Sequence, residues 1–144
     1  MIVKIKLLSS YVVRPFYATE GSSGLDLCSS SFSDIVVKPF SRELIPTGVS
    51  VEMPVGVEAQ IRSRSGITLK SGVIVLNSPG TIDSDYRGEI GVILMNLSNE
   101  DFLVKHGMKI AQMVFQKFEK VDIEFTDVLS DTARGSGGFG STGI

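Results

Sequence analysis

Hydrophobic residues in this chain recur at every second position, in short runs separated by glycine and proline. The alternation appears at residues 3–7, 49–53, 57–61 and 121–125. Period two is typical of a half-buried β-strand, because successive side chains of a strand point to opposite faces of the sheet. Gly and Pro turn signals at strand-sized intervals bound these runs. The pattern therefore predicts an all-β fold.

Three further runs are apolar at both parities, at residues 73–76, 90–97 and 110–118. We expect these runs to be core strands that are covered on both faces. Regular short strands with Gly and Pro between them favour a sandwich, jelly roll or barrel over βαβ units. We expect at most one short helix, which starts at Ser63 or Ser65 and runs toward Lys70.

The length of 144 residues predicts a single domain, and the last residues differ from it in composition. Residues 134–144 are mostly glycine and serine, with one arginine and one phenylalanine. Such a composition predicts a flexible tail. We place the β-rich domain at residues 1–130 and a mobile glycine-rich arm at residues 131–144.

Charge and hydropathy disfavour two classes of partner. The formal net charge is -2, so the chain lacks the general basic field that holds nucleic acid through its phosphates. No apolar stretch approaches the roughly 18 residues of a membrane span. Cys28 is the one cysteine and cannot form an intrachain disulfide. We expect no nucleic-acid or membrane partner and a cytoplasmic location.

The densest polar cluster is the segment from Gly80 to Glu89, between the apolar runs at 73–76 and 90–97. The placement predicts the turn of a hairpin. Asp83 and Asp85 are open to two interpretations: they accept N–H bonds within the turn, or one of them is a general base that activates a water molecule.

Other polar residues also admit two interpretations. Arg62-Ser63-Arg64-Ser65-Gly66 is either a solvated loop or a phosphate-binding segment. Asp26, between apolar neighbours, is a turn residue or is satisfied by an arginine or a metal-bound water. Gln112, inside an apolar run, is a satisfied core group or a ligand contact. The glycine-rich tail is a linker or a cradle for an anion.

The order of these motifs along the chain is specific. Gly-Leu-Asp-Leu at 24–27 is followed by Arg-Ser-Gly at 64–66, Gly-Thr-Ile-Asp-Ser-Asp-Tyr-Arg-Gly-Glu-Ile at 80–90, Lys-Ile-Ala-Gln-Met at 109–113 and the glycine-rich end from Arg134. This series resembles the homotrimeric dUTPase family from about Gly21 to Gly143. The resemblance implies a jelly-roll-like subunit of the β-clip type, and a homotrimer whose active sites are assembled from neighbouring chains.

The resemblance also implies the reaction, which is hydrolysis of dUTP to dUMP and pyrophosphate. In the family, water attacks the α-phosphorus in line with the leaving pyrophosphate, assisted by Mg²⁺. Such an enzyme, a dUTP diphosphatase, limits uracil in DNA and supplies dUMP for thymidylate synthesis. The glycine-rich arm is expected to close over bound nucleotide.

Site residues carry over by motif. Asp83 matches the base that orients the water, and Asp26 the carboxylate that touches the metal through water. Tyr86 matches the ring that packs on deoxyribose and excludes a 2′-hydroxyl. The remaining expected substrate contacts are Arg64, Ser65, Gly66 and Gln112 at the phosphates, Asn77, Gly80, Thr81, Ile82 and Gly91 around uracil, and Arg134, Phe139, Gly140 and Ser141 in the arm.

Two rival functions use the same motifs. A dCTP deaminase shares the fold but carries its proton on a glutamate, and Ile93 stands at that position here. A dUTP-sensing trimer would bind nucleotide without hydrolysing it. One departure is also informative: Met108 stands where the family usually has an acidic residue, which argues against a local ion pair to Lys109.

Overall fold

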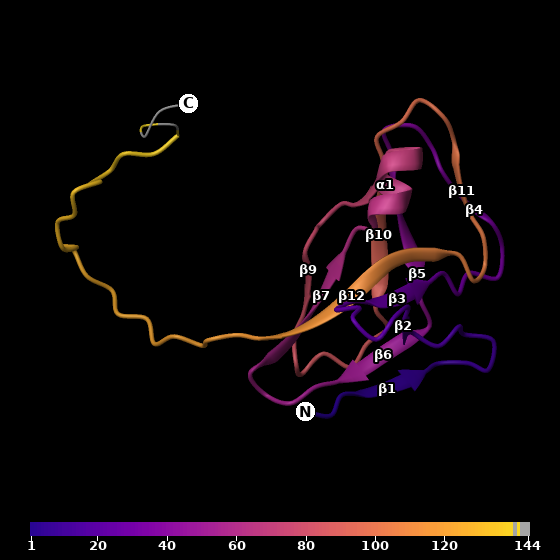
Figure 1. The fold of residues 1–144 in the computed structure, drawn as a ribbon, viewed down its shortest axis with the longest axis horizontal. Coiled ribbons are helices and arrows are strands. Elements are labelled where there is room, and N and C mark those ends of the chain that lie inside the picture. Colours follow the sequence, from indigo (N-terminus) through magenta and orange to yellow (C-terminus); the bar gives the residue numbers. More distant parts are fainter. Residues whose placement is uncertain (140, 142–144) are drawn as a thin grey trace.

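The computed structural model describes residues 1–139 and 141, and it is built from short strands and one short helix (Figure 1). In chain order the elements are β1 (Lys4–Leu7), β2 (Phe16–Tyr17), β3 (Leu25–Cys28), β4 (Ile35–Val37), β5 (Arg42–Pro46), β6 (Val49–Glu52), β7 (Val57–Arg62), α1 (Ser65–Ser71), β8 (Val73–Val75), β9 (Gly80–Ile82), β10 (Gly91–Asn96), β11 (Phe102–Val104) and β12 (Lys109–Lys117).

The strands form two larger and two smaller antiparallel sheets. One sheet has the order β2-β3-β12-β7-β9 and another β5-β10-β8, while β1-β6 and β11-β4 are two-stranded. Leu27 and Met113 of the first sheet and Ile45 and Leu94 of the second belong to one buried hydrophobic cluster. The core therefore joins the two larger sheets, as in the predicted jelly roll.

Local sequence explains most of these elements. The runs at 3–7, 49–53 and 57–61 are confirmed as β1, β6 and β7. The helix is also confirmed, and it ends where Gly72 adopts the left-handed φ of 65° and donates its N–H to the carbonyl of Thr68. No helix among the described residues is long and apolar enough to cross a membrane.

The strand predicted at residues 121–125 is wrong for this chain. Strand pairing ends with β12 at Lys117, and no helix or strand follows in residues 118–139. Val121, Ile123 and Phe125 are 71%, 76% and 94% exposed. Figure 1 shows this segment running away from the sheets, so the alternating side chains have no neighbouring strand to pair with.

The expectation that the core strands are covered on both faces holds for residues 110–114 of β12, apart from Gln112, but is wrong for β8 and β10 within one chain. Along β10, Val92 and Leu94 are buried, whereas Ile93 and Met95 between them are only partly buried. Ile93 lies opposite Leu44 of β5, which is 64% exposed. We call Ile93 and Met95, together with Leu44 of the paired strand β5, the outer face of β10; it is apolar and the described part of the chain leaves it partly exposed.

Candidate functional site

The longest motif lies in the connection from β8 to β10. These two strands pair antiparallel, as the predicted hairpin requires, but residues 80–82 form a strand where the prediction placed a turn. The connection also contains β9, which leaves the hairpin and pairs with β7 in the five-stranded sheet. Residues 83–90 therefore bridge the two larger sheets, and we call them the Tyr86 loop.

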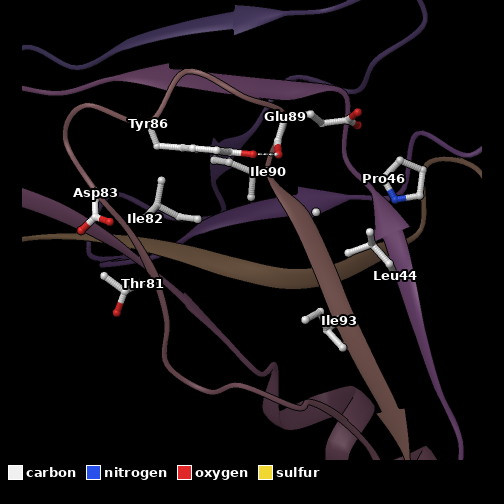
Figure 2. Close-up of a pocket in the computed structure, with 10 residues that line it drawn as sticks. Leu44, Pro46, Thr81, Ile82, Asp83, Tyr86, Glu89, Ile90 and Ile93 are labelled. Carbon is white, nitrogen blue, oxygen red and sulfur yellow. Dashed lines mark hydrogen bonds between the residues drawn. The ribbon is translucent and has the colours of Figure 1, made fainter.

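A cavity of about 430 Å³ lies beside this loop (Figure 2), and we call it the Tyr86 cavity. It brings together five of the predicted site residues, with apolar walls from β5 and β10. Its lining consists of Leu44, Pro46, Thr81, Ile82, Asp83, Tyr86, Glu89, Ile90, Gly91 and Ile93. A largely apolar cleft with a few polar groups is typical of a small-molecule site.

The ring of Tyr86 is held in a defined position. Its hydroxyl donates to the carbonyl of Glu89 at 2.9 Å, the bond drawn in Figure 2. A Cβ on Gly88 would lie 2.3 Å from that hydroxyl oxygen, so the loop accepts only glycine there without moving the ring. The ring therefore forms a fixed wall of the cavity.

Asp83 begins the turn that carries Tyr86. The N–H of Tyr86 donates to the carbonyl of Asp83 at 3.2 Å. The Asp83 side chain is exposed, and its carboxylate makes no hydrogen bond or ion pair with any described residue. Such a carboxylate keeps its lone pairs free to accept a proton from a bound water.

Asn77 and Gly80 lie at the start of this connection and outside the Tyr86 cavity lining. Asn77 is exposed and Gly80 is buried. A Cβ on Gly80 would lie 3.1 Å from Asn77 Nδ2, so the absence of a side chain at 80 lets the amide of Asn77 lie close to the backbone.

The residues predicted to contact phosphate or metal lie in a second cavity of about 410 Å³, which we call the Arg64 cavity. All five expected phosphate or metal residues of the folded body line it. The lining consists of Ala18, Gly21, Ser22, Ser23, Gly24, Asp26, Arg64, Ser65, Gly66 and Gln112. It shares no residue with the lining of the Tyr86 cavity.

Asp26 is the electrostatic centre of the Arg64 cavity. Its side chain is 10% exposed, and its two oxygens lie 3.0 Å from Arg64 Nε and 2.8 Å from Lys109 Nζ. Both contacts are ion pairs, and among the described residues Asp26 Oδ2 has no hydrogen-bond partner. An arginine therefore satisfies this buried carboxylate, one of the interpretations that the sequence left open.

Lys109 is a residue that sequence reasoning missed. The sequence argument from Met108 against a local ion pair to Lys109 is wrong, because Lys109 pairs with Asp26 of β3 instead. Lys109 lies opposite Cys28 in the β3–β12 register, near Asp26, and its Nζ lies 4.5 Å from the centroid of the Phe16 ring. Burial, together with the Asp26 charge, raises the pKa of the neighbouring Cys28 thiol.

Gln112 of β12 lies between the β3 side and the β7 side of the Arg64 cavity. It is opposite both Asp26 of β3 and Arg62 of β7 in the sheet. Its Nε2 donates to the carbonyl of Ser63 at 2.9 Å, and a Cβ on Gly24 would lie 2.6 Å from its Oε1. The amide is thus a satisfied group at the cavity wall whose carbonyl oxygen lies against a bare backbone.

Ser65 and Gly66 form the first turn of α1. Arg64 is the N-cap and its side chain makes no capping bond, since it is directed to Asp26 and to the carbonyl of Lys109. The first intrahelical bond runs from the Thr68 N–H to the Arg64 carbonyl, so the N–H groups of Ser65 and Gly66 have no helical partner. Free N–H groups beside a guanidinium suit phosphate oxygens.

The described arm residues Arg134, Phe139 and Ser141 line neither cavity of this chain. Arg134 Nε donates to the carbonyl of Gly137 at 2.8 Å, and the Phe139 ring is fully exposed. Ser141 is also exposed, and Gly140 lies outside the described residues. Figure 1 shows the arm extending away from the folded body.

Comparison with known proteins gives consistent matches over almost the whole chain. The chain matches the dUTPase family over residues 10–143. It is 52% identical over 143 residues to a deoxyuridine 5'-triphosphate nucleotidohydrolase of Rickettsia prowazekii (strain Madrid E), covering 99% of this chain and 97% of the relative. The enzyme of the same description from Rickettsia bellii (strain OSU 85-389) is 51% identical.

Solved structures agree with this result. A dUTPase of Staphylococcus bacteriophage 80alpha, solved with dUPNHPP, has a TM-score of 0.85 at 26% identity and covers 99% of both chains. A dUTPase of phage phi11 of S. aureus, solved with a structural Mg(II) ion, has a TM-score of 0.82 at 20% identity. The match covers 91% of this chain and 100% of the phage chain. With two cavities lined by its motifs and a family match across most of its length, this chain belongs to the dUTPase family.

Proposed function

We propose that this chain is a dUTP diphosphatase that hydrolyses dUTP to dUMP and pyrophosphate. The observation that carries the proposal is the 52% identity to a deoxyuridine 5'-triphosphate nucleotidohydrolase along 99% of the chain. In the reaction, the water oxygen bonds to the α-phosphorus as the bond from that phosphorus to the oxygen between the α- and β-phosphates breaks, and this oxygen leaves with the pyrophosphate. Removal of dUTP limits uracil in DNA, and the dUMP that is formed supplies thymidylate synthesis.

Asp83 is the proposed general base. Its carboxylate has no hydrogen-bond or ion-pair partner in the part of the chain that the structure describes, and it lies in the wall of the Tyr86 cavity. It accepts a proton from the attacking water as the new bond to phosphorus forms. A positioned base contributes about 10² to 10⁴ in rate.

The Tyr86 cavity is the proposed nucleoside site. The fixed ring of Tyr86 packs on deoxyribose and leaves no room for a 2′-hydroxyl, which rejects UTP. Around the base, Thr81, Ile82 and Gly91 contribute cavity wall, and Asn77 and Gly80 contribute amide and backbone groups at the adjoining turn. Polar groups fixed to pair with uracil would be left unpaired by cytosine, which gives strong discrimination.

The Arg64 cavity is the proposed triphosphate site. Arg64 offers a planar set of donors, Ser65 and Gly66 offer free N–H groups, and Gln112 offers an amide. These groups neutralise and orient the triphosphate, and Ser65 stabilises charge that develops on the leaving side.

The proposed active form is a homotrimer in which one active site combines cavities from neighbouring chains. Two features support it: the Tyr86 and Arg64 cavities have no lining residue in common, and the apolar outer face of β10 is partly exposed. Burial of such a face against another copy is favourable by roughly 25 cal/mol per Å².

Mixed assemblies test the shared site. Asp83→Asn and Arg64→Gln variants are each expected to be nearly inactive, and co-refolding them should restore activity because some mixed sites hold both intact residues. Co-refolded samples of each variant with itself are the control. No recovery on mixing would place both residues in the same chain's site.

The proposed arm, residues 131–144, closes over bound nucleotide. Arg134 would bind phosphate oxygens, Phe139 would stack on the base, and Gly140 and Ser141 would contribute backbone and hydroxyl donors. Stacking of a base on an aromatic ring is worth about 1 to 3 kcal/mol, which offsets the entropy cost of ordering glycines. The extended course of residues 118–139 supports delivery of the arm to another chain.

The chemistry of the donor set fits a magnesium ion that is held mainly by substrate. Among the described residues no three His, Cys, Asp or Glu side chains come together to hold a metal. Asp26 supplies one carboxylate, already paired with two cations, which suits contact through a retained water. Bound Mg²⁺ would neutralise charge on the triphosphate.

A cytoplasmic location completes the proposal, since a free thiol such as that of Cys28 persists in a reducing compartment.

Three readouts separate the proposed function from both rivals. Pyrophosphate release should be measured with dUTP, dCTP, dTTP and UTP, each with and without Mg²⁺, beside ammonia release from dCTP and equilibrium binding of dUTP. The proposal predicts release from dUTP alone at a substantial rate, with stimulation by Mg²⁺. Deamination of dCTP would support the deaminase, although Ile93 cannot carry a proton, and binding of dUTP without turnover would support the sensor.

A further inference from the structure

Glu89 makes two contacts at opposite ends of the residue. Its backbone carbonyl accepts the hydrogen bond from the Tyr86 hydroxyl at 2.9 Å, and its Oε1 accepts a hydrogen bond from the Gly48 N–H at 2.7 Å. In Figure 2 the Glu89 side chain points away from the Tyr86 ring, toward Pro46. One residue therefore connects the ring to the turn between β5 and β6.

The Gly48 end of this connection is rigid. Gly48 is buried and adopts φ of 67°, and a Cβ there would lie 2.2 Å from the Val12 side chain. Its carbonyl accepts the N–H of Leu8. A buried N–H without a partner is costly, so the Glu89 carboxylate satisfies a group that the turn itself leaves unpaired.

Other bonds between the Tyr86 loop and this part of the fold use the loop main chain. Ser50 Oγ donates to the carbonyl of Arg87 at 2.8 Å, and the N–H of Ile90 donates to the carbonyl of Val49 at 2.8 Å. Among the described residues, Glu89 contributes the one side chain of the loop that bonds to the β5–β6 turn. The anchor is at the same residue that binds the Tyr86 hydroxyl.

We propose that Glu89 is a positioning residue for sugar specificity. Its carboxylate holds the Glu89 backbone against Gly48, and the Glu89 carbonyl holds the Tyr86 ring in the position that excludes a 2′-hydroxyl. The inference rests on the proposed function, because it assigns the Tyr86 ring to the deoxyribose. Glu89 itself does not contact the reacting atoms.

Steady-state kinetics with dUTP and UTP test this role. Glu89→Ala removes the carboxylate that accepts from the Gly48 N–H. Loss of a charged hydrogen bond of this kind lowers the ratio of anchored to released loop conformations by about tenfold or more. We expect the ratio of kcat/KM for dUTP over UTP to fall at least about tenfold. Glu89→Gln keeps an oxygen acceptor for the Gly48 N–H and should retain the ratio within about twofold.

Ser50→Ala is the matched control, because it removes an anchor of the same loop at Arg87 and leaves the Glu89 contacts in place. It should lower thermal stability without changing the dUTP/UTP ratio. If Glu89→Ala does not fold, Glu89→Met, which keeps length and lacks an acceptor, replaces it. A Tyr86→Phe cycle adds a second readout: the losses from Glu89→Ala and Tyr86→Phe should not add, since both act through one ring.

Three results would overturn the role. They are an unchanged ratio in Glu89→Ala, an equal loss of ratio in Ser50→Ala, and full additivity with Tyr86→Phe. These outcomes differ from failure of the proposed function, which would appear as absence of pyrophosphate release from dUTP by the unmodified protein.

Discussion

Gly88→Ala is expected to damage sugar recognition while leaving the fold nearly intact. A Cβ at position 88 would lie 2.3 Å from the Tyr86 hydroxyl oxygen and 2.5 Å from the ring carbon that bears it. Because ordinary contacts begin near 3.4 Å, the ring has to move by roughly 1 Å. That movement breaks the hydrogen bond to the Glu89 carbonyl.

The magnitude follows from these distances. A misplacement of about 1 Å in a positioning group can cost about 10²-fold in rate. We expect kcat/KM for dUTP to fall by about that factor and the preference for dUTP over UTP to shrink. Since Tyr86 is 44% exposed, it can swing toward solvent, so the melting temperature should change by only a few degrees, on the order of 1 kcal/mol.

Steady-state pyrophosphate release and thermal unfolding of the same samples provide the assay. Ser84→Ala is the matched control in the same loop, because it keeps the Ser84 carbonyl that accepts from Arg87. A Gly88→Ala enzyme with unchanged kcat/KM and unchanged selectivity would show that the position of the Tyr86 ring does not set the specificity.

Two further variants and one labelling experiment test the arm, the Arg64 cavity and the Cys28 thiol. Deletion of residues 134–144 should leave a folded protein with reduced kcat/KM, and unchanged kinetic constants would rule out a closing arm. Gly24→Ala should push the Gln112 side chain off Ser63 and raise KM for dUTP about tenfold, measured against the affinity for dUMP, which should not change. The raised pKa of Cys28 should slow labelling of the native thiol by an alkylating reagent relative to the unfolded chain, and rapid native labelling would contradict this raised pKa. The contribution of the Cys28 thiol to folding stability is complete below the ordinary thiol pKa and is lost as pH rises toward the raised value.

The sequence predicted strands well where the partner strand belongs to the same chain. The alternation at 57–61 became β7, because β12 and β9 flank it. The same alternation at 121–125 produced no strand, since periodicity records which face is apolar but not whether a partner strand exists. The outer face of β10 presents the same problem, because an apolar run does not say which molecule covers it.

The candidate site divides in the same way. Motif order identified five of the ten lining residues of each cavity. The pairing of Asp26 with Lys109 depends on the β3–β12 register, which includes a shift between Lys109 and Ala111. The Glu89 contact to Gly48 joins residues 41 apart across a turn with positive φ. Neither contact leaves a local pattern, so neither could be read from the sequence.

The central claim is that the Asp83 carboxylate activates the attacking water. Pyrophosphate release by Asp83→Asn, measured beside equilibrium binding of dUTP to the same protein, tests it most directly. The account predicts retained dUTP affinity and a kcat lower by roughly 10² or more, which corresponds to about 3 kcal/mol of transition-state stabilisation. Turnover close to that of the unmodified protein would remove Asp83 from the mechanism.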